Sequence, residues 1–343
     1  MNSEFLNALD QIEKEKNISK DILLDAIDAA LVSAYKRNYN TSHGNVVVNI
    51  DRDSGEVKVF VQKEVVEQVD DPMTQISLDD AAKISGKYEL GDIVNIEDAP
   101  AEFGRIAAQT AKQVVMQRIK EAERTLIYDE FSEKEHQLLT GVVQRIEKKN
   151  IYLDIGKTEA YLAPSEQVPT ESYTFHKRMK VYVTEVRRTT KGSLVNVSRS
   201  KPALVAKLFE EEIPEIHDGI VEIKSIAREA GSRSKIAVLS NDSNIDPIGA
   251  CIGAKGTRVQ TIVDELNGEK IDIVKYSDDP GEFIIASLNP AEVLSLDIDT
   301  EAKEANVIVP ADQLSLAIGK EGQNARLAAR LTGYKIDIKS DNM

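Results

Sequence analysis

The sequence has a single cysteine, Cys251, among its 343 residues, so no internal disulfide can form and a reducing compartment such as the cytoplasm is expected. No apolar run approaches the ~18 residues that a membrane helix needs. The first residues lack the basic and apolar segments of a signal peptide. These absences point away from disulfide-rich secreted proteins and helical membrane proteins, and no membrane partner is expected.

Motifs of common catalytic and metal sites are also missing. The chain has no G-x-x-x-x-G-K-[ST], H-E-x-x-H or G-x-S-x-G string. Its four histidines are far apart and show no metal-ligand spacing. We therefore expect no metal, no cofactor and no catalytic residues, which points away from an enzyme.

The charge balance lacks the basic excess that is typical of non-specific nucleic-acid binders. The chain has 43 lysines and arginines against 58 aspartates and glutamates, a formal net charge of −15. Only residues 131–200 contain more basic than acidic side chains. Nucleic-acid binding through local basic patches remains possible, and the change of sign indicates a separate domain.

Residues 1–130 are expected to form an α+β N-terminal domain, with two helices first and strand patterns after them. A long helix is predicted from Phe103 to about Glu130, because apolar residues recur every three or four positions. Its expected buried face consists of Ala107, Ala111, Val115, Ile119, Ala122 and Leu126. Arg105 and Lys112 recur on the opposite face, where simple solvation of the helix is the ordinary alternative to a binding role.

From about Leu138 the apolar pattern changes to a period of two. Five short strands with turn residues between them fit a small barrel, of which the oligonucleotide-binding fold is the common example. The predicted strands are Gly141–Val143, Ile151–Ile155, Ala160–Leu162, Val181–Val183 and Leu194–Val197. We assign this barrel to residues 131–200.

The barrel segment combines aromatic and basic residues. Tyr152, Tyr161, Tyr173 and Phe175 could stack on bases, which contributes ~1–3 kcal/mol per base. Cations that could bind phosphates are Lys148, Lys149, Lys157, Lys177, Arg178, Arg187 and Arg188. Alternatively, the strand tyrosines belong to the barrel core. The strand period leaves this open for Tyr152 and Tyr161, whereas Tyr182 between two valines is expected in the core or at its rim.

Residues 201–343 contain an internal repeat. Ile252–Gly256 matches Ile318–Gly322 at an offset of 66, and Gly268–Ile273 matches Gly333–Ile338 at an offset of 65. Each copy has the pattern helix, strand, strand, helix, Gly-x-x-Gly, helix, strand. Two copies are too few for a solenoid, so a tandem pair of one small fold is expected.

We place the two copies at 201–276 and 277–343. Asp312 shares the offset of 66 with Asp246 and is expected to cap the helix before the second Gly-x-x-Gly. Cys251 lies on the apolar approach to the first Gly-x-x-Gly and is expected to be packed rather than reactive.

A Gly-x-x-Gly between two helices has a physical use in binding nucleic acids. Glycines let a nucleic-acid backbone approach the main chain closely, and N–H groups at the start of the next helix favour phosphate. Unpaired bases can then lie in the adjacent apolar groove, as single-stranded RNA does in KH domains. The candidate RNA-binding residues here are Gly253, Ala254, Lys255, Gly256, Arg258, Gly319, Lys320, Glu321 and Gly322. A lone match is more often a helix C-cap and turn, but two copies in one repeated frame favour RNA binding.

An α+β head, an S1-type barrel and two tandem KH domains occur in this order in the NusA family of bacterial transcription termination/antitermination proteins. The chain resembles that family along nearly its whole length. The strings that carry the resemblance are Phe103–Gln109, Ile252–Val259 and Ala317–Asn324. The resemblance implies a multidomain α+β protein in which a long helix connects the head to the barrel and both KH domains are of type II.

The resemblance also implies partners. The head would bind RNA polymerase near the exit channel and flap region, with Arg105 and Lys112 facing polymerase or the emerging hairpin. The barrel and KH pair would form one surface for nascent single-stranded RNA, and other Nus antitermination factors would join. A transcription elongation factor that modulates pausing, hairpin-dependent termination and antitermination is expected, monomeric when free. The acidic C-terminal repeats of some members are not expected, because the sequence stops just after the last KH strand.

Two other functions remain open. Phosphorolytic exonucleases also carry KH and S1 modules, although they place KH before S1 and add catalytic cores that residues 1–130 could not hold. A ribosome-assembly or translation factor could also bind RNA through such modules. Phosphate-dependent RNA degradation would identify the first alternative, and co-purification with ribosomal particles instead of polymerase would identify the second.

Overall fold

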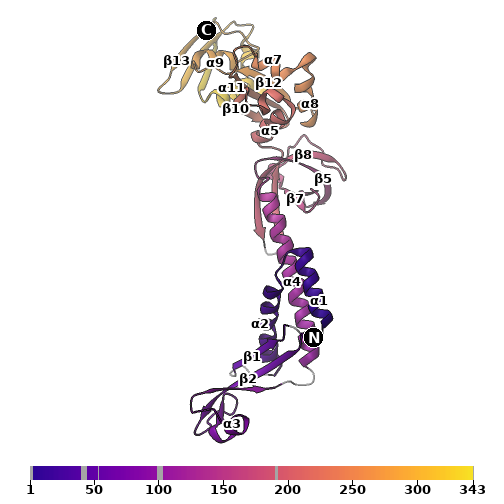
Figure 1. The fold of residues 1–343 in the computed structure, drawn as a ribbon. Coiled ribbons are helices and arrows are strands. Elements are labelled where there is room, and N and C mark those ends of the chain that lie inside the picture. Colours follow the sequence, from indigo (N-terminus) through magenta and orange to yellow (C-terminus); the bar gives the residue numbers. More distant parts are fainter. Residues whose placement is uncertain (1–2, 40–44, 53, 99–102, 190–191, 343) are drawn as a thin grey trace. The chain divides into compact units, whose positions relative to one another are not determined.

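The computed structural model forms two compact units, residues 1–126 and 127–343 (Figure 1). The residues that it describes are 3–39, 45–52, 54–98, 103–189 and 192–342. None of the helices in these ranges has the length and apolar character needed to cross a membrane.

The first unit is an α+β domain with a four-stranded sheet. Its elements are α1 (Ser3–Lys16), α2 (Lys20–Tyr39), β1 (Asn45–Ile50), β2 (Val57–Val66), β3 (Gln75–Ser77), α3 (Leu78–Ile84), β4 (Ile93–Glu97) and most of α4 (Phe103–Ser132). Strand β2 pairs antiparallel with β1 and β4 and parallel with β3. The predicted order of two helices, strands and a long helix is confirmed.

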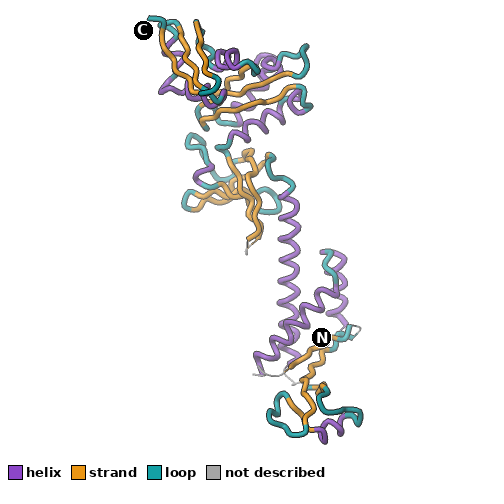
Figure 2. The backbone as a smooth tube through the Cα atoms, turned by 90° about the vertical axis from the view of Figure 1, so that its left-hand side faces the viewer, coloured by secondary structure: helices purple, strands orange, loops and turns teal. Residues whose placement is uncertain are grey.

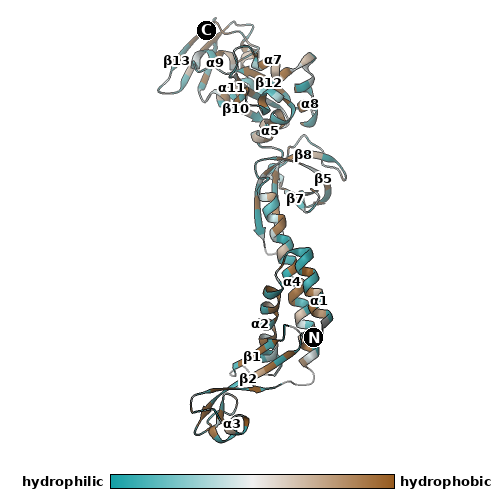
Figure 3. Cartoon of the chain, in the orientation of Figure 1, coloured by the Kyte–Doolittle hydropathy of each residue, from teal (hydrophilic) through white to brown (hydrophobic). Residues whose placement is uncertain are grey.

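Helices α1, α2 and α4 share one apolar core with strands β1 and β2. Burial alternates along β1, and the apolar side of α4 runs along the helix as brown segments between teal ones (Figure 3). The predicted buried face of α4 is correct at Ala107, Ala111 and Val115 but wrong at Leu126, which is 62% exposed. Helix α1 ends at Lys16, which pairs with Glu123 of α4, so α1 supplies no apolar side chain beyond that point.

The second unit begins with the predicted five-stranded barrel, which is closed (Figure 2). Its strands are β5 (Leu138–Glu147), β6 (Asn150–Asp154), β7 (Glu159–Leu162), β8 (Arg178–Thr189) and β9 (Gly192–Ser198), in the order β5-β6-β7-β9-β8. Alternate residues such as Ile151, Leu153 and Leu162 point into the core. The short 3₁₀ helix η1 (Pro164–Glu166) follows β7. Away from the bulges in β5 and β8, alternate strand positions therefore face outward.

The two repeat copies fold alike. The first contains α5 (Pro202–Glu212), α6 (Pro214–His217), β10 (Val221–Glu229), β11 (Arg233–Ser240), α7 (Pro247–Ile252), η2 (Ala254–Gly256), α8 (Thr257–Glu265) and β12 (Lys270–Lys275). The second contains α9 (Pro280–Ser287), β13 (Ser295–Asp299), β14 (Glu304–Val309), α10 (Leu314–Ile318), η3 (Lys320–Gly322), α11 (Gln323–Thr332) and β15 (Lys335–Ser340). In each sheet the middle strand is antiparallel to the first strand and parallel to the last, as expected for type II KH domains.

One predicted helix cap is wrong. Asp246 caps α7, since its carboxylate accepts hydrogen bonds from the backbone N of Ile248 and Gly249. Helix α10 instead begins after Gln313, without a side-chain cap, so Asp312 has no such role. In the first copy a proline directly follows Asp246 and starts the helix. In the second copy Pro310 comes earlier, and a turn over residues 311–313 delays the helix.

Helices cover both faces of the first KH sheet. Helices α5, α7 and α8 of the first copy share a core with one face, which includes Ile236 and Val238. Helices α9 and α11 of the second copy contact the other face. The core shared by the two copies consists of Ala227, Ala237, Val274, Phe283, Leu327 and Leu331. The KH pair is therefore one packed body.

The equivalent face of the second sheet is polar. Register places Asn306 opposite Asp337, as Lys235 is opposite Asp272 in the first copy. Lys235 is buried, whereas Asn306 and Asp337 are exposed. The second sheet is therefore suited to water on the face that the first sheet uses for packing.

Arg199 joins the barrel to the first KH copy. Its side chain is only 2% exposed and pairs with Glu171 of the barrel at 2.5 Å and with Glu265 of α8 at 2.9 Å. The guanidinium also donates to the carbonyl oxygens of Lys180 and Glu265. These partners compensate a charge that would otherwise be costly to bury.

Candidate nucleic-acid interface

The two Gly-x-x-Gly loops have the same backbone conformation. Each follows a short helix, α7 or α10, and leads directly into α8 or α11. Positive φ angles occur at the first, third and fourth loop positions: 72°, 55° and 77° at Gly253, Lys255 and Gly256, and 76°, 54° and 75° at Gly319, Glu321 and Gly322. The sequence repeat is thus also a repeat of loop geometry.

The first glycine of each loop is required by packing. A Cβ atom at Gly253 would lie 2.7 Å from Cγ of Arg258. At Gly319 it would lie 2.8 Å from the backbone N of Asn324. Both distances are well below van der Waals contact, so a side chain at Gly253 would displace the side chain of Arg258, and one at Gly319 would force the next helix to move.

The second glycine of each loop faces open space. A Cβ at Gly256 would meet no described atom within 4 Å, and at Gly322 the nearest atom would be Nη1 of Arg326 at 3.4 Å. The main chain is therefore accessible at these two positions, which is what close approach of a nucleic-acid backbone requires.

The middle loop residues project into solvent. Lys255 and Lys320 are exposed, as predicted, and Ala254 and Glu321 are exposed beside them. The two loops thus differ in charge, because Glu321 offsets Lys320 in the second loop.

One apolar residue at each loop escaped the sequence-based prediction. Ile252 and Ile318 directly precede the first glycine and are 38% and 36% exposed. An exposed isoleucine at the same place in both copies offers an apolar surface for a base. Their shared offset of 66 was the signal that could have identified them.

Arg258 braces the first loop from behind. Its Nη1 pairs with Oε2 of Glu215 at 2.9 Å and donates to the carbonyl oxygen of Ala250 at 2.7 Å. A backbone N–H and the Arg258 guanidinium together lower the pKa of Glu215. Arg258, which was predicted to bind RNA, therefore also holds the first loop in place through Glu215.

Cys251 is fully buried next to the first loop. Burial raises the pKa of its thiol to about 12, and the thiolate is the reactive form. We expect no reaction of the folded protein with Ellman's reagent at about pH 8, and rapid reaction in guanidinium chloride. Fast labelling of the native protein would contradict a packed thiol.

The barrel displays a pair of tyrosines. Tyr152 on β6 and Tyr161 on β7 are directly opposite in register, with ring centroids 5.6 Å apart. The residues on either side of each tyrosine are buried, so both tyrosines point outward; they are Ile151, Leu153, Ala160 and Leu162. The Tyr161 hydroxyl donates to Oδ1 of Asn150 at 3.0 Å. The alternative that these two rings belong to the core is therefore wrong.

Arg145 covers one face of Tyr152. Its guanidinium carbon lies 3.9 Å from the ring centroid, and the side chain pairs with Glu147 and Glu159. A β-bulge just before Arg145 sets it opposite Tyr152. Simple alternation does not predict such a bulge, and the sequence-based prediction missed this residue.

The predicted barrel cations do not form one cluster. Lys148 and Lys149 are exposed at the tip of the β5–β6 hairpin, with φ of 48° and 75°. Arg178 is exposed at the start of β8, opposite Val142 of β5, so one strand separates it from the β6 strand of Tyr152. Other predicted cations form surface ion pairs: Lys157 with Glu130, Arg187 with Glu185 and Arg188 with Asp129.

The other three aromatic residues considered in the barrel segment differ in exposure. Phe175 is exposed, but Tyr173 packs against the barrel core and is not available for stacking. The Tyr173 hydroxyl donates to Glu171 and accepts from the backbone N of Val168, and burial raises its pKa. Tyr182 packs against the core of the first KH copy, which fits the predicted position at the barrel rim.

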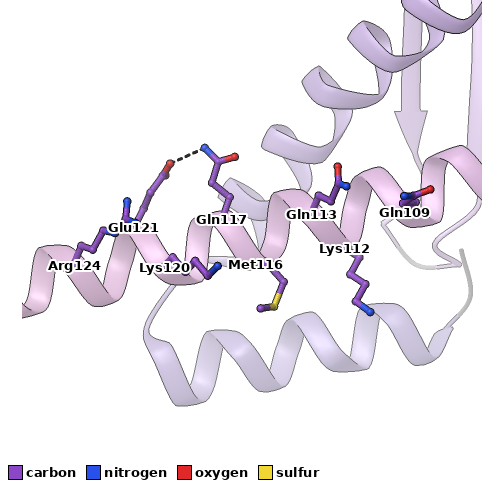
Figure 4. Close-up of a pocket in the computed structure, with 8 residues that line it drawn as sticks. All are labelled: Gln109, Lys112, Gln113, Met116, Gln117, Lys120, Glu121 and Arg124. Carbon is purple, nitrogen blue, oxygen red and sulfur yellow. Dashed lines mark hydrogen bonds between the residues drawn. The ribbon is translucent and has the colours of Figure 1, made fainter. Parts of the chain in front are cut away.

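Helix α4 carries a donor-rich face in the first unit. Arg105 and Lys112 are both exposed. Lys112 also borders a surface groove, whose other lining residues are Gln109, Gln113, Met116, Gln117, Lys120, Glu121 and Arg124 (Figure 4). Most of these side chains end in amide, ammonium or guanidinium donors. The donor-rich face of α4 therefore extends well beyond Arg105 and Lys112.

The described residues include no group of three or more His, Cys, Asp or Glu side chains that could hold a metal ion. A closed five-stranded barrel followed by a tandem pair of KH domains defines a multidomain protein of the RNA-binding class. Family models match at the NusA N-terminal domain, the S1 RNA binding domain, the NusA-like first KH domain and the NusA-like second KH domain, over residues 4–125, 132–198, 199–276 and 280–343.

Curated relatives extend this match to the whole chain. The transcription termination/antitermination protein NusA of Halalkalibacterium halodurans is 56% identical over 100% of this chain and 89% of its own length. The protein of the same name from Bacillus subtilis is 57% identical over 99% and 92%. That of Thermus thermophilus is 45% identical over 99% and 90%. The chain belongs to the NusA family of transcription termination/antitermination proteins.

Proposed function

We propose that the barrel and the KH pair bind nascent single-stranded RNA while the head binds RNA polymerase near the exit channel and flap region. In this role the protein modulates pausing, hairpin-dependent termination and antitermination together with other Nus factors. It acts without catalysis, in the cytoplasm, and is monomeric when free. The observation that carries the proposal is the pair of loops with one backbone conformation on a fused KH body.

We assign polymerase binding to residues 1–130, and RNA binding to the barrel at 131–200 and the KH domains at 201–276 and 277–343. The proposed RNA contacts in the barrel are Lys148, Lys149, Tyr152, Tyr161 and Arg178. Those in the KH loops are Gly253, Ala254, Lys255, Gly256, Gly319, Lys320, Glu321 and Gly322, with Arg258 behind the first loop.

Transcription in vitro with the cognate polymerase tests this function. We expect longer pauses and more efficient termination at hairpin-dependent sites when the protein is added. Unchanged pause lifetimes would contradict a role in elongation. Phosphate-dependent degradation of the transcript would instead support the exonuclease alternative.

Replacing Arg105 and Lys112 by alanine should shorten pauses without changing the affinity for free RNA, because these cations belong to the head rather than to the KH loops or barrel. The matched control is Lys58→Ala with Lys87→Ala, which removes the same charge from other exposed positions of the head. Loss of free-RNA affinity with normal pausing would contradict a polymerase- or hairpin-facing role.

A further inference from the structure

Glu229, the last residue of β10 in the first KH domain, reaches the helix that follows the second loop. Its carboxylate accepts from Nε2 of Gln323 at 2.8 Å and from Nε of Arg326 at 3.0 Å. Nη1 of Arg330 lies 4.0 Å from Oε1 of Glu229 and adds a further positive charge. Hydrogen bonds from Arg326 and Gln323 lower the pKa of Glu229, so it is charged at neutral pH.

Arg326 continues this contact into the second loop. Its Nη1 donates to the carbonyl oxygen of Glu321, the third loop residue. The same nitrogen is the nearest atom to the open side of Gly322. The carboxylate of Glu229 in the first KH domain thus binds the guanidinium of Arg326, and this guanidinium in turn binds the backbone of the second loop.

A second path ties the same loop to the first domain. Buried Lys235 donates to the carbonyl oxygen of Asn289, which lies between α9 and β13 of the second domain. Asn324 donates to the neighbouring carbonyl of Leu288 and also to that of Ala317, just before the second loop. Helix α11 is therefore anchored at its first turn as well as through the shared apolar core.

The first loop is braced from within its own domain. Its brace, Arg258, pairs with Glu215 of the same domain. The position equivalent to Arg258 in the second copy is Asn324, which has no guanidinium. The second loop is braced instead by the guanidinium of Arg326, whose partner Glu229 belongs to the other domain. The two loops share one conformation but are supported differently.

We propose that Glu229 of the first KH domain is a positioning residue for RNA binding at the second Gly-x-x-Gly loop. Glu229 acts through Arg326 and does not contact RNA itself. The inference rests on the proposed RNA-binding function.

The direction in which Glu229→Gln changes the RNA affinity distinguishes a positioning role from a simple effect of charge. Removing a carboxylate near a phosphate-binding loop should by itself tighten RNA binding. If Glu229 positions the loop, Glu229→Gln should weaken binding by about fivefold, the lower end of typical coupling between sites. The matched control Glu222→Gln removes the same charge from the same strand, far from Arg326, and should not weaken binding.

The experiment uses the full chain and an unstructured oligoribonucleotide of about ten nucleotides, since a KH domain binds about four. Glu229→Gln is measured alone and together with Gly256→Asp or Gly322→Asp, which disable the first or the second loop. When added to Gly256→Asp, Glu229→Gln should still weaken RNA binding fivefold. When added to Gly322→Asp, it should cause no further loss of affinity. Hydrogen exchange should be faster for the amides of residues 319–322 in Glu229→Gln, with an unchanged melting temperature.

Three outcomes would overturn the inference while leaving RNA binding intact: tighter binding, an equal loss with both loop variants, or an unchanged loop exchange rate. If neither Gly256→Asp nor Gly322→Asp weakens binding, the proposed RNA-binding function of the loops itself fails. The two failures are therefore distinguishable.

Discussion

Replacing both Gly256 and Gly322 by aspartate is expected to lower the affinity for single-stranded RNA by about 10²-fold or more. Each substitution places a carboxylate on the accessible main chain of a loop, where phosphate would otherwise approach. Loss of one charge-assisted hydrogen bond costs ~1.5–3 kcal/mol, and two loops lose at least one each. Fluorescence anisotropy with a labelled oligoribonucleotide measures the change.

The control for this double variant comes from the same repeat. Gly268 and Gly333 also have positive φ, 88° and 77°, and a Cβ atom at either would meet no described atom within 4 Å, but they lie at the far ends of α8 and α11. Gly268→Asp with Gly333→Asp therefore adds equal charge and similar backbone strain away from the loops. An equal loss of affinity in this control would show that charge or strain, and not loop contact, is responsible.

Replacing Arg199 by methionine is expected to lower the free energy of unfolding by about 3–5 kcal/mol, the usual cost of breaking a buried ion pair from one side. Glu171, whose side chain is 1% exposed, would lose its guanidinium partner in a site closed to water. The Lys180 and Glu265 carbonyl oxygens would each lose a hydrogen bond. Urea denaturation of the full chain measures the change.

Arg187→Met is the matched control for Arg199. Arg187 pairs with Glu185 on the barrel surface and is 64% exposed, so its loss should lower the free energy of unfolding far less than the loss of Arg199. The double variant Arg199→Met with Glu171→Gln should recover part of the stability, because it no longer buries an uncompensated charge. A loss for Arg199→Met as small as that of Arg187→Met would contradict a stabilising role.

The architecture followed largely from patterns within short segments. The change of apolar period predicted the barrel, and the offset between the two Gly-x-x-Gly strings predicted a repeated fold. Errors arose where the outcome depended on neighbours in space. Leu126 fits the apolar stripe of α4 but lies beyond the reach of α1, and Asp312 occupies the equivalent of Asp246 without the proline that starts the helix.

The loops of the candidate site could be predicted from the sequence, but the residues that position these loops and the outward face of the barrel could not. Alternation along a strand gives two faces without saying which one is wet, so only the closed barrel shows that Tyr152 and Tyr161 point outward. The pairing of Glu229 with Arg326 joins residues far apart in the chain, and no local pattern marks either of them. Such pairs become visible only when the tertiary contacts are known.

The core shared by the KH domains has a consequence for synthesis on the ribosome. Ala227, Ala237 and Val274 leave the exit tunnel well before Leu327 and Leu331, which cover them in the finished protein. During translation the first KH sheet is therefore open to water, or to chaperones, on one apolar face. Its final stability arrives only when α11 has been made, so the two repeats mature together although they are translated one after the other.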